Sequence, residues 1–319
     1  MSGAGERERL SKVVSRDRDN SILPVSGRGC KAGNPDDLWR IGENVRNLSF
    51  LGYRQNNLYV LRKEPGNVKI QAFKQETEER WMPEIGMILR EGKGKKVYAT
   101  DDPDKAIVYF KDEAMAFHGL KRGRILGKGE VNNAVCEHLF SLLDANGIES
   151  HFIEKIDARH SLVKRCEMLP FSVKIRNRAA GQMADKTGIP VGQKLDPPVV
   201  EYVMRGTDID VDPMINHTHI YAMKAATPEE MAQIDSTCLK VNAILTAYLK
   251  EINIELIDFK LEFGRYHGRI IVADEITPDT ARFWDSSTHE PLDKDRFRRD
   301  MDNVAEAYQE VLHRMMGVS

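Results

Sequence analysis

Cysteine, long apolar runs and an excess of charge of one sign are all scarce in this sequence. Four cysteines are spread over 319 residues with no Cys-X-X-Cys pair, which argues against a zinc knuckle or a disulfide framework. No apolar run approaches the roughly 18 residues of a membrane-spanning helix, and the amino terminus lacks the apolar core of a signal peptide. The formal net charge of -2 gives no general reason to expect nucleic acid or an anionic membrane as a partner. We therefore expect a cytoplasmic protein with neither partner.

What the sequence does contain is typical of a globular protein, with 30% charged and 41% hydrophobic residues. The length suggests two domains or one large α/β unit. Residues 1–38 are rich in Gly, Ser, Arg and Asp and favour a mobile tail, whereas residues 58–73 suggest a small hairpin. We divide the chain into a partly disordered extension (1–85), a β-rich lobe (86–165) and a larger α/β domain (166–319).

Three stretches predict helices. Apolar residues recur at helical spacing from Lys128 until Asn146-Gly147 ends the pattern. A longer amphipathic helix is predicted over residues 228–253, with Thr227 as its N-cap and Glu230 completing a capping box. Residues 297–316 predict a last amphipathic helix.

Residues 255–263 alternate as a strand with one apolar and one charged face. The expected core face holds Ile257, Phe259, Leu261 and Phe263. The other face holds Asp258, Lys260 and Glu262. A solvated strand face is the ordinary explanation of such a row.

A metal site at the end of this hairpin is the alternative. The partner strand, residues 268–274, is so apolar that we expect it to be buried, and uncompensated carboxylates at its end would be costly. Glu262 and Asp274 can meet across the hairpin. Hard oxygen ligands of this kind suit Mg²⁺ bound together with nucleotide phosphates.

A glycine-rich turn, Gly92 to Lys96, lies between two predicted strands and could approach phosphate oxygens. It is not a Walker A motif, and an exposed loop is the alternative. Lys111 on the next strand is either a kinase-like phosphate contact or a strand-edge lysine. Gly127-Lys128-Gly129, just before a helix, offers another phosphate contact through helix amides.

Arginines form a further cluster. Arg176 and Arg178 share one side of a predicted strand, where guanidinium groups could grip a phosphate monoester, unless they are ordinary surface arginines. Asp279 and Arg282 follow shortly after Asp274 and would bring an acceptor and another guanidinium to the same site.

Several segments resemble, in order, the signature segments of the SAICAR synthetase family. They read EGKGKKVYATDDPD, LPFSVKIRNRAAG, VDPMI, LIDFKLEFG and VADEITPDTARFWD. The resemblance runs from about Met87 to Met316. It implies an α+β or α/β fold in which a small β-rich, kinase-like, ATP-grasp-related lobe packs on a larger α/β domain. It also implies an ATP- and Mg²⁺-dependent ligase of purine biosynthesis that joins L-aspartate to carboxyaminoimidazole ribonucleotide (CAIR) through an acyl phosphate.

The resemblance also implies roles for individual residues. ATP would be bound by the loop, the following strand and an interdomain hinge: Lys93, Gly94, Lys95, Lys111, Lys164 and Met168. Mg²⁺ would be bound by Glu262 and Asp274. The imidazole nucleotide or aspartate would be bound by Arg176, Gln182, Arg205, Asp212, Asp258, Lys260, Asp279 and Arg282. Among these, the expected catalytic residues are Lys260, Arg176 and Asp258.

Two positions depart from the family pattern, since Ser172 and Gln182 stand where a glutamate and a serine are usual. A ligase acting on another imidazole or amine is therefore one alternative function. A kinase-like phosphotransferase is disfavoured, because no HRD or DFG motif follows Lys111. A catalytically silent nucleotide-binding protein is the third, and a homo-oligomer stays open.

Overall fold

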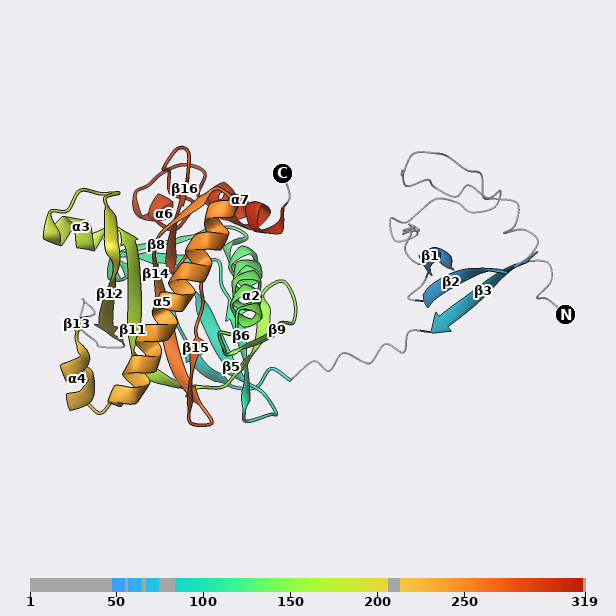
Figure 1. The fold of residues 1–319 in the computed structure, drawn as a ribbon, viewed down its shortest axis with the longest axis horizontal. Coiled ribbons are helices and arrows are strands. Elements are labelled where there is room, and N and C mark those ends of the chain that lie inside the picture. The colour runs from blue at the N-terminus through green and yellow to red at the C-terminus, as the bar shows by residue number, and fades with distance from the viewer. Residues whose placement is uncertain (1–47, 55–56, 65–66, 75–83, 206–212, 318–319) are drawn as a thin grey trace. The chain divides into compact units, whose positions relative to one another are not determined.

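The computed structural model describes residues 48–54, 57–64, 67–74, 84–205 and 213–317, in two units, Met1–Trp81 and Met82–Ser319 (Figure 1). In the first unit, strands β1 (Leu48–Arg54), β2 (Asn57–Glu64) and β3 (Asn67–Lys74) form an antiparallel sheet in that order. Strands β2 and β3 coincide with the segment where the sequence suggests a hairpin. The tail expected over residues 1–38 lies outside the described residues.

The second unit begins with a small antiparallel sheet in the order β4-β5-β6-β10-β9. Its strands are β4 (Ile88–Glu91), β5 (Lys95–Ala99), β6 (Lys105–Phe110), β9 (Phe152–Lys155) and β10 (His160–Lys164). Helix α2 (Lys128–Ala145) covers one face of this sheet, as its periodicity predicts (Figure 1). Alternate residues of β6, Ala106, Val108 and Phe110, are buried in the core that α2 shares.

A larger sheet runs in the order β13-β12-β11-β14-β15, and β16 also pairs with β14. Its strands are β11 (Glu167–Arg178), β12 (Lys194–Met204), β13 (Met214–Ile215), β14 (Ile254–Tyr266), β15 (Arg269–Ala273) and β16 (Ala281–Asp285). The long helix α5 (Pro228–Glu251) packs against one face of this sheet (Figure 1). Its capping box is confirmed, because the Thr227 hydroxyl accepts from Glu230 N and the Glu230 carboxylate accepts from Thr227 N.

The remaining elements lie outside the two larger sheets. They are β7 (Glu113–Ala116), the 3-10 turn η2 (Phe117–Gly119), β8 (Lys121–Arg124), α3 (Gln182–Thr187), α4 (His217–Ala222), α6 (Asp295–Arg298) and α7 (Val304–Met316). The single helix expected over residues 297–316 is wrong. The chain leaves helical geometry after α6, and Asp300 and Asn303 adopt positive φ angles of 54° and 57° before α7 begins. None of the helices in the described residues is long and apolar enough to cross a membrane.

One main core unites both sheets, α2, α5 and α7, and a bulge decides which side of β14 faces it. Between Leu256 and Asp258 the pairing of β14 with β16 shifts by one residue. Leu256 and Phe259 therefore both lie in the main core, whereas Ile257 belongs to a separate small cluster with Ala180 and Trp284. Placing Ile257 on the face of Phe259 is thus wrong, because strict alternation ignores the extra residue.

Candidate active site

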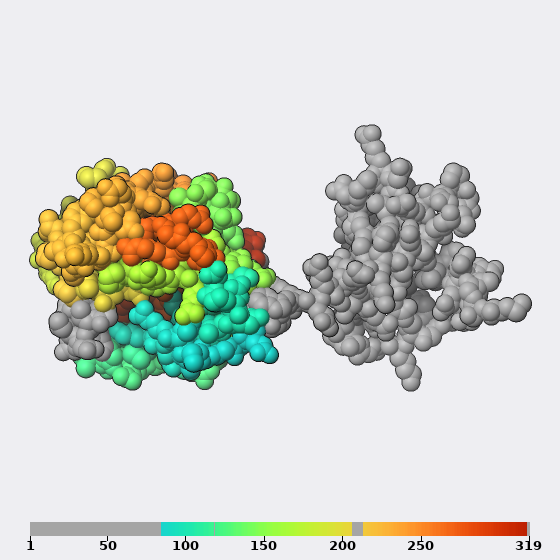
Figure 2. All heavy atoms as spheres, turned by 90° about the horizontal axis from the view of Figure 1, so that it is seen from below, coloured from blue at the N-terminus to red at the C-terminus, as the bar shows by residue number. Residues whose placement is uncertain are grey.

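The face of the large sheet that looks away from the main core carries a charged row. On β14 this row is Asp258, Lys260 and Glu262, as predicted. Their cross-strand partners on β11 share the face and are, in the same order, Arg176, Lys174 and Ser172. Lys174 belongs to this row but is not among the residues assigned from the sequence, because a lone lysine in an apolar strand gives no signal. Figure 2 shows a recess between the cyan segment near residues 85–110 and the lime and yellow segments above it.

Asp258 holds two arginines at one end of the row. Arg176 Nη1 donates to Asp258 Oδ2 at 2.9 Å, and Arg282 Nη1 donates to the same oxygen at 2.8 Å. Arg176 also pairs with Glu201, and Arg282 Nε donates to Asp295 at 2.8 Å. The side chains of Arg176 and Arg282 are only 6% and 17% exposed, so they are not ordinary surface arginines. Burial alone would lower the pKa of Arg282, but the two aspartates raise it.

Gly181 makes room for the second arginine. A Cβ atom on Gly181 would lie 2.6 Å from Arg282 Nη2, and its φ of 55° with ψ of -143° is a conformation that other residues avoid. The tight turn after β11 therefore lies directly against the guanidinium group. This packing fixes the orientation of Arg282 toward Asp258.

At the other end, Glu262 and Asp274 come together as predicted. Lys260 Nζ lies 3.1 Å from Asp274 Oδ2 and also pairs with Glu262 Oε1. Lys95 Nζ pairs with Asp274 and lies 3.0 Å from Glu275 Oε1. Burial and the neighbouring Asp274 raise the pKa of Glu262, whereas Lys95 and Lys260 overcome the effect of burial and hold the pKa of Asp274 well below its usual range.

The carboxylate pair fits a divalent cation. Glu262 Oε2 is buried and accepts no hydrogen bond. Arg205 Nη1 lies 2.5 Å away and offsets its charge, but without hydrogen-bond geometry, so this oxygen can still bind a metal ion. Lys260 already places an ammonium group between these carboxylates, and Lys95 places a second one beside Asp274. No group of three or more potential protein ligands occurs in the described residues. A cation here would therefore complete its shell with water or phosphate oxygens.

The glycine-rich turn leads into Lys95, which reaches Asp274. Gly92 to Gly94 connect β4 and β5, and Gly92 N donates to Lys95 O at 2.8 Å. Lys95 points inward to Asp274, whereas Lys93 is exposed. Lys111 supports the turn through its backbone N, which donates to Gly94 O at 2.8 Å, but its ammonium group pairs with Glu91.

The expected phosphate contact through the first amides of α2 is wrong. Gly129 N already donates to the Asp112 carboxylate at 3.0 Å, and a Cβ on Gly129 would lie 2.4 Å from Phe110 O, which leaves no space for a ligand. Arg159 also donates to Asp112, at 2.8 Å. Despite the opposing effect of burial, these donors lower the pKa of Asp112 to about 2. The start of α2 is therefore capped from within the protein.

A second group of buried residues surrounds Asp279. Its carboxylate accepts from Lys128 Nζ at 2.6 Å, Tyr308 Oη at 2.8 Å and Asn132 Nδ2 at 3.1 Å, and Lys294 Nζ lies 3.7 Å away. Of these five residues the sequence assigns Asp279 to the substrate, and it places Lys128 only in the segment whose backbone amides it predicts to meet phosphate. The cluster combines Lys128 and Asn132, one turn apart on α2, with Lys294 and Tyr308 from near the carboxyl terminus. Residues so far apart in the chain form no local sequence pattern that could have revealed it.

The hinge between the sheets passes close to β14. A Cβ on Gly264 would lie 2.5 Å from Cys166 Cβ and 3.3 Å from Met168 Sδ, so a glycine is needed there. Lys164 Nζ turns away to Glu149 at 3.0 Å. Gln182 is exposed at the start of α3, and Asp212 lies outside the described residues.

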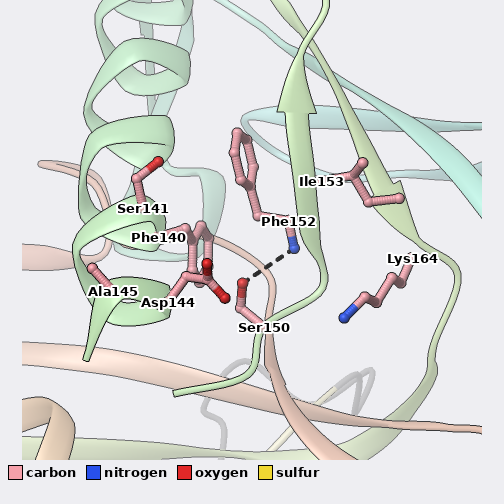
Figure 3. Close-up of a pocket in the computed structure, with 8 residues that line it drawn as sticks. All are labelled: Phe140, Ser141, Asp144, Ala145, Ser150, Phe152, Ile153 and Lys164. Carbon is pink, nitrogen blue, oxygen red and sulfur yellow. Dashed lines mark hydrogen bonds between the residues drawn. The ribbon is translucent and has the colours of Figure 1, made fainter. Parts of the chain in front are cut away.

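A pocket of 240 Å³ lies elsewhere, between the end of α2 and β9 (Figure 3). Phe140, Asp144, Ser150 and Phe152 help to line it. Lys164 is the one assigned residue in its wall, and none of the charged row contributes to it. This pocket is therefore separate from the site built on β11 and β14.

Comparison with known proteins adds a family. The family model described as SAICAR synthetase matches residues 88–315. The phosphoribosylaminoimidazole-succinocarboxamide synthase of Coprothermobacter proteolyticus is 51% identical over 229 residues, which is 72% of this chain and 97% of that protein. The same synthase from Ehrlichia chaffeensis has a solved structure with a TM-score of 0.70 and 38% identity, covering 73% of this chain and 100% of that one. A SAICAR synthetase solved in complex with ADP gives a TM-score of 0.69 and 43% identity, covering 72% and 97%.

Proposed function

Because the chain belongs to the SAICAR synthetase family, we propose that its charged sheet face binds CAIR and activates the carboxylate of this substrate. The protein is an ATP-dependent ligase of purine biosynthesis that joins L-aspartate to CAIR and forms SAICAR, ADP and phosphate. The observation that carries the assignment of the site is the row Asp258, Lys260 and Glu262, in which both carboxylates are buried and Lys260 is partly exposed, flanked by two guanidinium groups. A solvated strand face would not be buried in this way.

ATP would lie between the small sheet and this face. The turn residues Lys93, Gly94 and Lys95 would hold its phosphates. Adenine would lie beside the hinge of residues 164–168. The ADP complex of a relative supports a nucleotide site in this fold.

Mg²⁺ would be held by Glu262 and Asp274 together with phosphate oxygens. When bound, the metal would neutralise charge on the transferring phosphoryl group. The ammonium groups of Lys95 and Lys260 hold the pKa of Asp274 low and so keep this ligand ionised.

Arg176 and Arg282 would grip anionic oxygens of CAIR, and Asp258 would orient both arginines. Arg205, Gln182, Asp212 and Asp279 are proposed to bind the remaining parts of CAIR or aspartate.

The chemistry needs two balanced steps. First, a carboxylate oxygen of CAIR bonds to the terminal phosphorus of ATP, and the electron pair of the broken P–O bond leaves with ADP. Then the aspartate amine bonds to the acyl carbon, phosphate leaves with the C–O electron pair, and the amine loses its proton to solvent. Lys260 would offset the charge that develops in both steps, and positioning supplies most of the rate.

An isotope experiment tests this route. With ¹⁸O in the carboxylate of CAIR, one labelled oxygen should appear in the released phosphate, and ADP should form steadily only when both CAIR and aspartate are present. Label that stayed wholly in the imidazole product would exclude the acyl phosphate. Turnover with another amine but not with aspartate would instead support altered specificity, with Ser172 and Gln182 as the first positions to examine. A cytoplasmic location and the absence of nucleic acid and membrane partners remain predictions from composition.

A further inference from the structure

Lys128, the first residue of α2, has an ammonium group buried beneath the glycine-rich turn. Its side chain is 0% exposed, and its Nζ lies 2.6 Å from Asp279 Oδ2. Within the described residues the structure gives this ammonium group one partner, although it carries three N–H donors. Two donors of this buried cation therefore have no acceptor among the described residues.

Asn132 lies one turn further along α2, and its side chain lacks a hydrogen-bond donor where Lys128 lacks acceptors. Its Nδ2 donates to Asp279 at 3.1 Å, but its buried Oδ1 has no donor. The adjacent Asn133 differs, because its Nδ2 donates to Asp157 O at 2.9 Å and its Oδ1 accepts from Ser161. Leaving a buried acceptor unpaired is destabilising, so Asn132 indicates that a hydrogen-bond donor comes to this point.

The glycine-rich turn lies close to Lys128. A Cβ on Gly94 would lie 3.7 Å from Lys128 Nζ and 3.5 Å from Asp279 Oδ2. Asp279 carries one negative charge and faces two ammonium groups, those of Lys128 and Lys294, as well as the Tyr308 hydroxyl. Glu275 also acts on Lys294, so these carboxylates balance the two ammonium groups, and the unused N–H donors of Lys128 are what favour an anionic ligand at this point.

We propose that Lys128 is a further catalytic residue, which donates hydrogen bonds to the terminal phosphoryl group of ATP while this group moves to the substrate carboxylate. Asn132 Oδ1 accepts from a water molecule on the same phosphoryl group. Lys128 transfers no proton in this step: the bond between the terminal phosphorus and the bridging oxygen breaks, its electron pair leaves with ADP, and the new O–P bond forms. The ammonium group offsets the charge on the phosphoryl oxygens. This inference rests on the proposed function.

Calorimetric titration of the full chain tests the proposal with two probes, ADP and the ATP analogue AMP-PNP, both with Mg²⁺. Lys128→Met should weaken AMP-PNP binding about 10- to 100-fold, the loss expected for one or two charge-assisted hydrogen bonds. ADP lacks the terminal phosphoryl group and should bind within twofold of wild type. Lys240→Met, on an exposed position of α5, serves as the control and should change neither affinity.

Asn132→Ala removes no charge and provides a second variant if Lys128→Met does not fold. It should weaken AMP-PNP about threefold and leave ADP unchanged. If either variant weakened the affinities for both nucleotides equally, the residue would have a role in the fold. If AMP-PNP affinity were unchanged, the residue would not contact the terminal phosphoryl group. Either result overturns the proposal for Lys128 but leaves the proposed function standing. A wild-type protein that binds neither nucleotide would refute the proposed function itself.

Discussion

Substitution of Gly94 tests the nucleotide site separately from the stability of the fold. A methyl group at this position would meet Asp279 Oδ2 at 3.5 Å and Lys128 Nζ at 3.7 Å, which are ordinary van der Waals distances in the free protein. Gly94 does not use a positive φ, so alanine can adopt its backbone conformation. We therefore expect Gly94→Ala to fold with unchanged or slightly increased stability, by up to about 1 kcal/mol.

The same methyl group should obstruct ATP. It points toward Lys128 and Asp279, where phosphate oxygens would need to approach the backbone. Losing one charge-assisted hydrogen bond costs about 1.5–3 kcal/mol, which corresponds to a roughly 10- to 150-fold weaker affinity. Titration calorimetry with ATP and Mg²⁺ measures the affinity, and thermal unfolding measures the stability.

Gly129→Ala is the matched contrast. Here the methyl group would lie 2.4 Å from Phe110 O, a backbone atom that cannot turn aside, so about 1–3 kcal/mol of stability should be lost. For a unit of this size the midpoint of thermal unfolding should fall by about 2–4 °C for each kcal/mol. Wild-type affinity of Gly94→Ala for ATP, or a loss of stability as large as that of Gly129→Ala, would refute this account of the glycine-rich turn.

Three further predictions follow from the site. Arg282→Lys should lower kcat/KM for CAIR on the order of 10²-fold, because an ammonium group cannot replace a guanidinium held by two aspartates. Arg269→Lys, on an exposed position, is the control and should leave kcat/KM unchanged. If both variants had the same kcat/KM, the assignment of Arg282 would be contradicted. ATP at 100 times its Kd should stabilise the protein by about 2.7 kcal/mol with Mg²⁺ and much less with EDTA, and Asp274→Asn should abolish this difference in a thermal shift assay. Asp112→Asn should cost about 2 kcal/mol at neutral pH, because the pKa of Asp112 is lowered from 3.8 to about 2 in the folded state. The stabilisation exists above the unfolded pKa and is lost as pH falls from about 4 to about 2, so urea unfolding of wild type and variant should converge over that range.

Sequence periodicity located the elements whose signals are local. In helices α2 and α5 apolar residues recur at helical spacing over many turns, and the capping box at Thr227 sets where α5 starts. Glu262 and Asp274 could be paired because a hairpin brings its two ends together whatever the rest of the fold does. The break between α6 and α7 could not be found in this way, since the apolar periodicity continues through residues that adopt positive φ angles.

The charged face shows why the remainder of the site needed the fold. The bulge at Ile257 changes the face of every residue that precedes it on β14, but it depends on the pairing with β16, about 25 residues away in the chain. Likewise, a lysine that opens a helix is usually a solvated end, and only the arrival of Asp279 from beyond β15 and Tyr308 from α7 makes Lys128 a buried cation. Charge that must be compensated by distant segments leaves no pattern in the local sequence. It becomes visible as a buried group with too few partners, and Lys128 and Asn132 are two such groups on one face of α2.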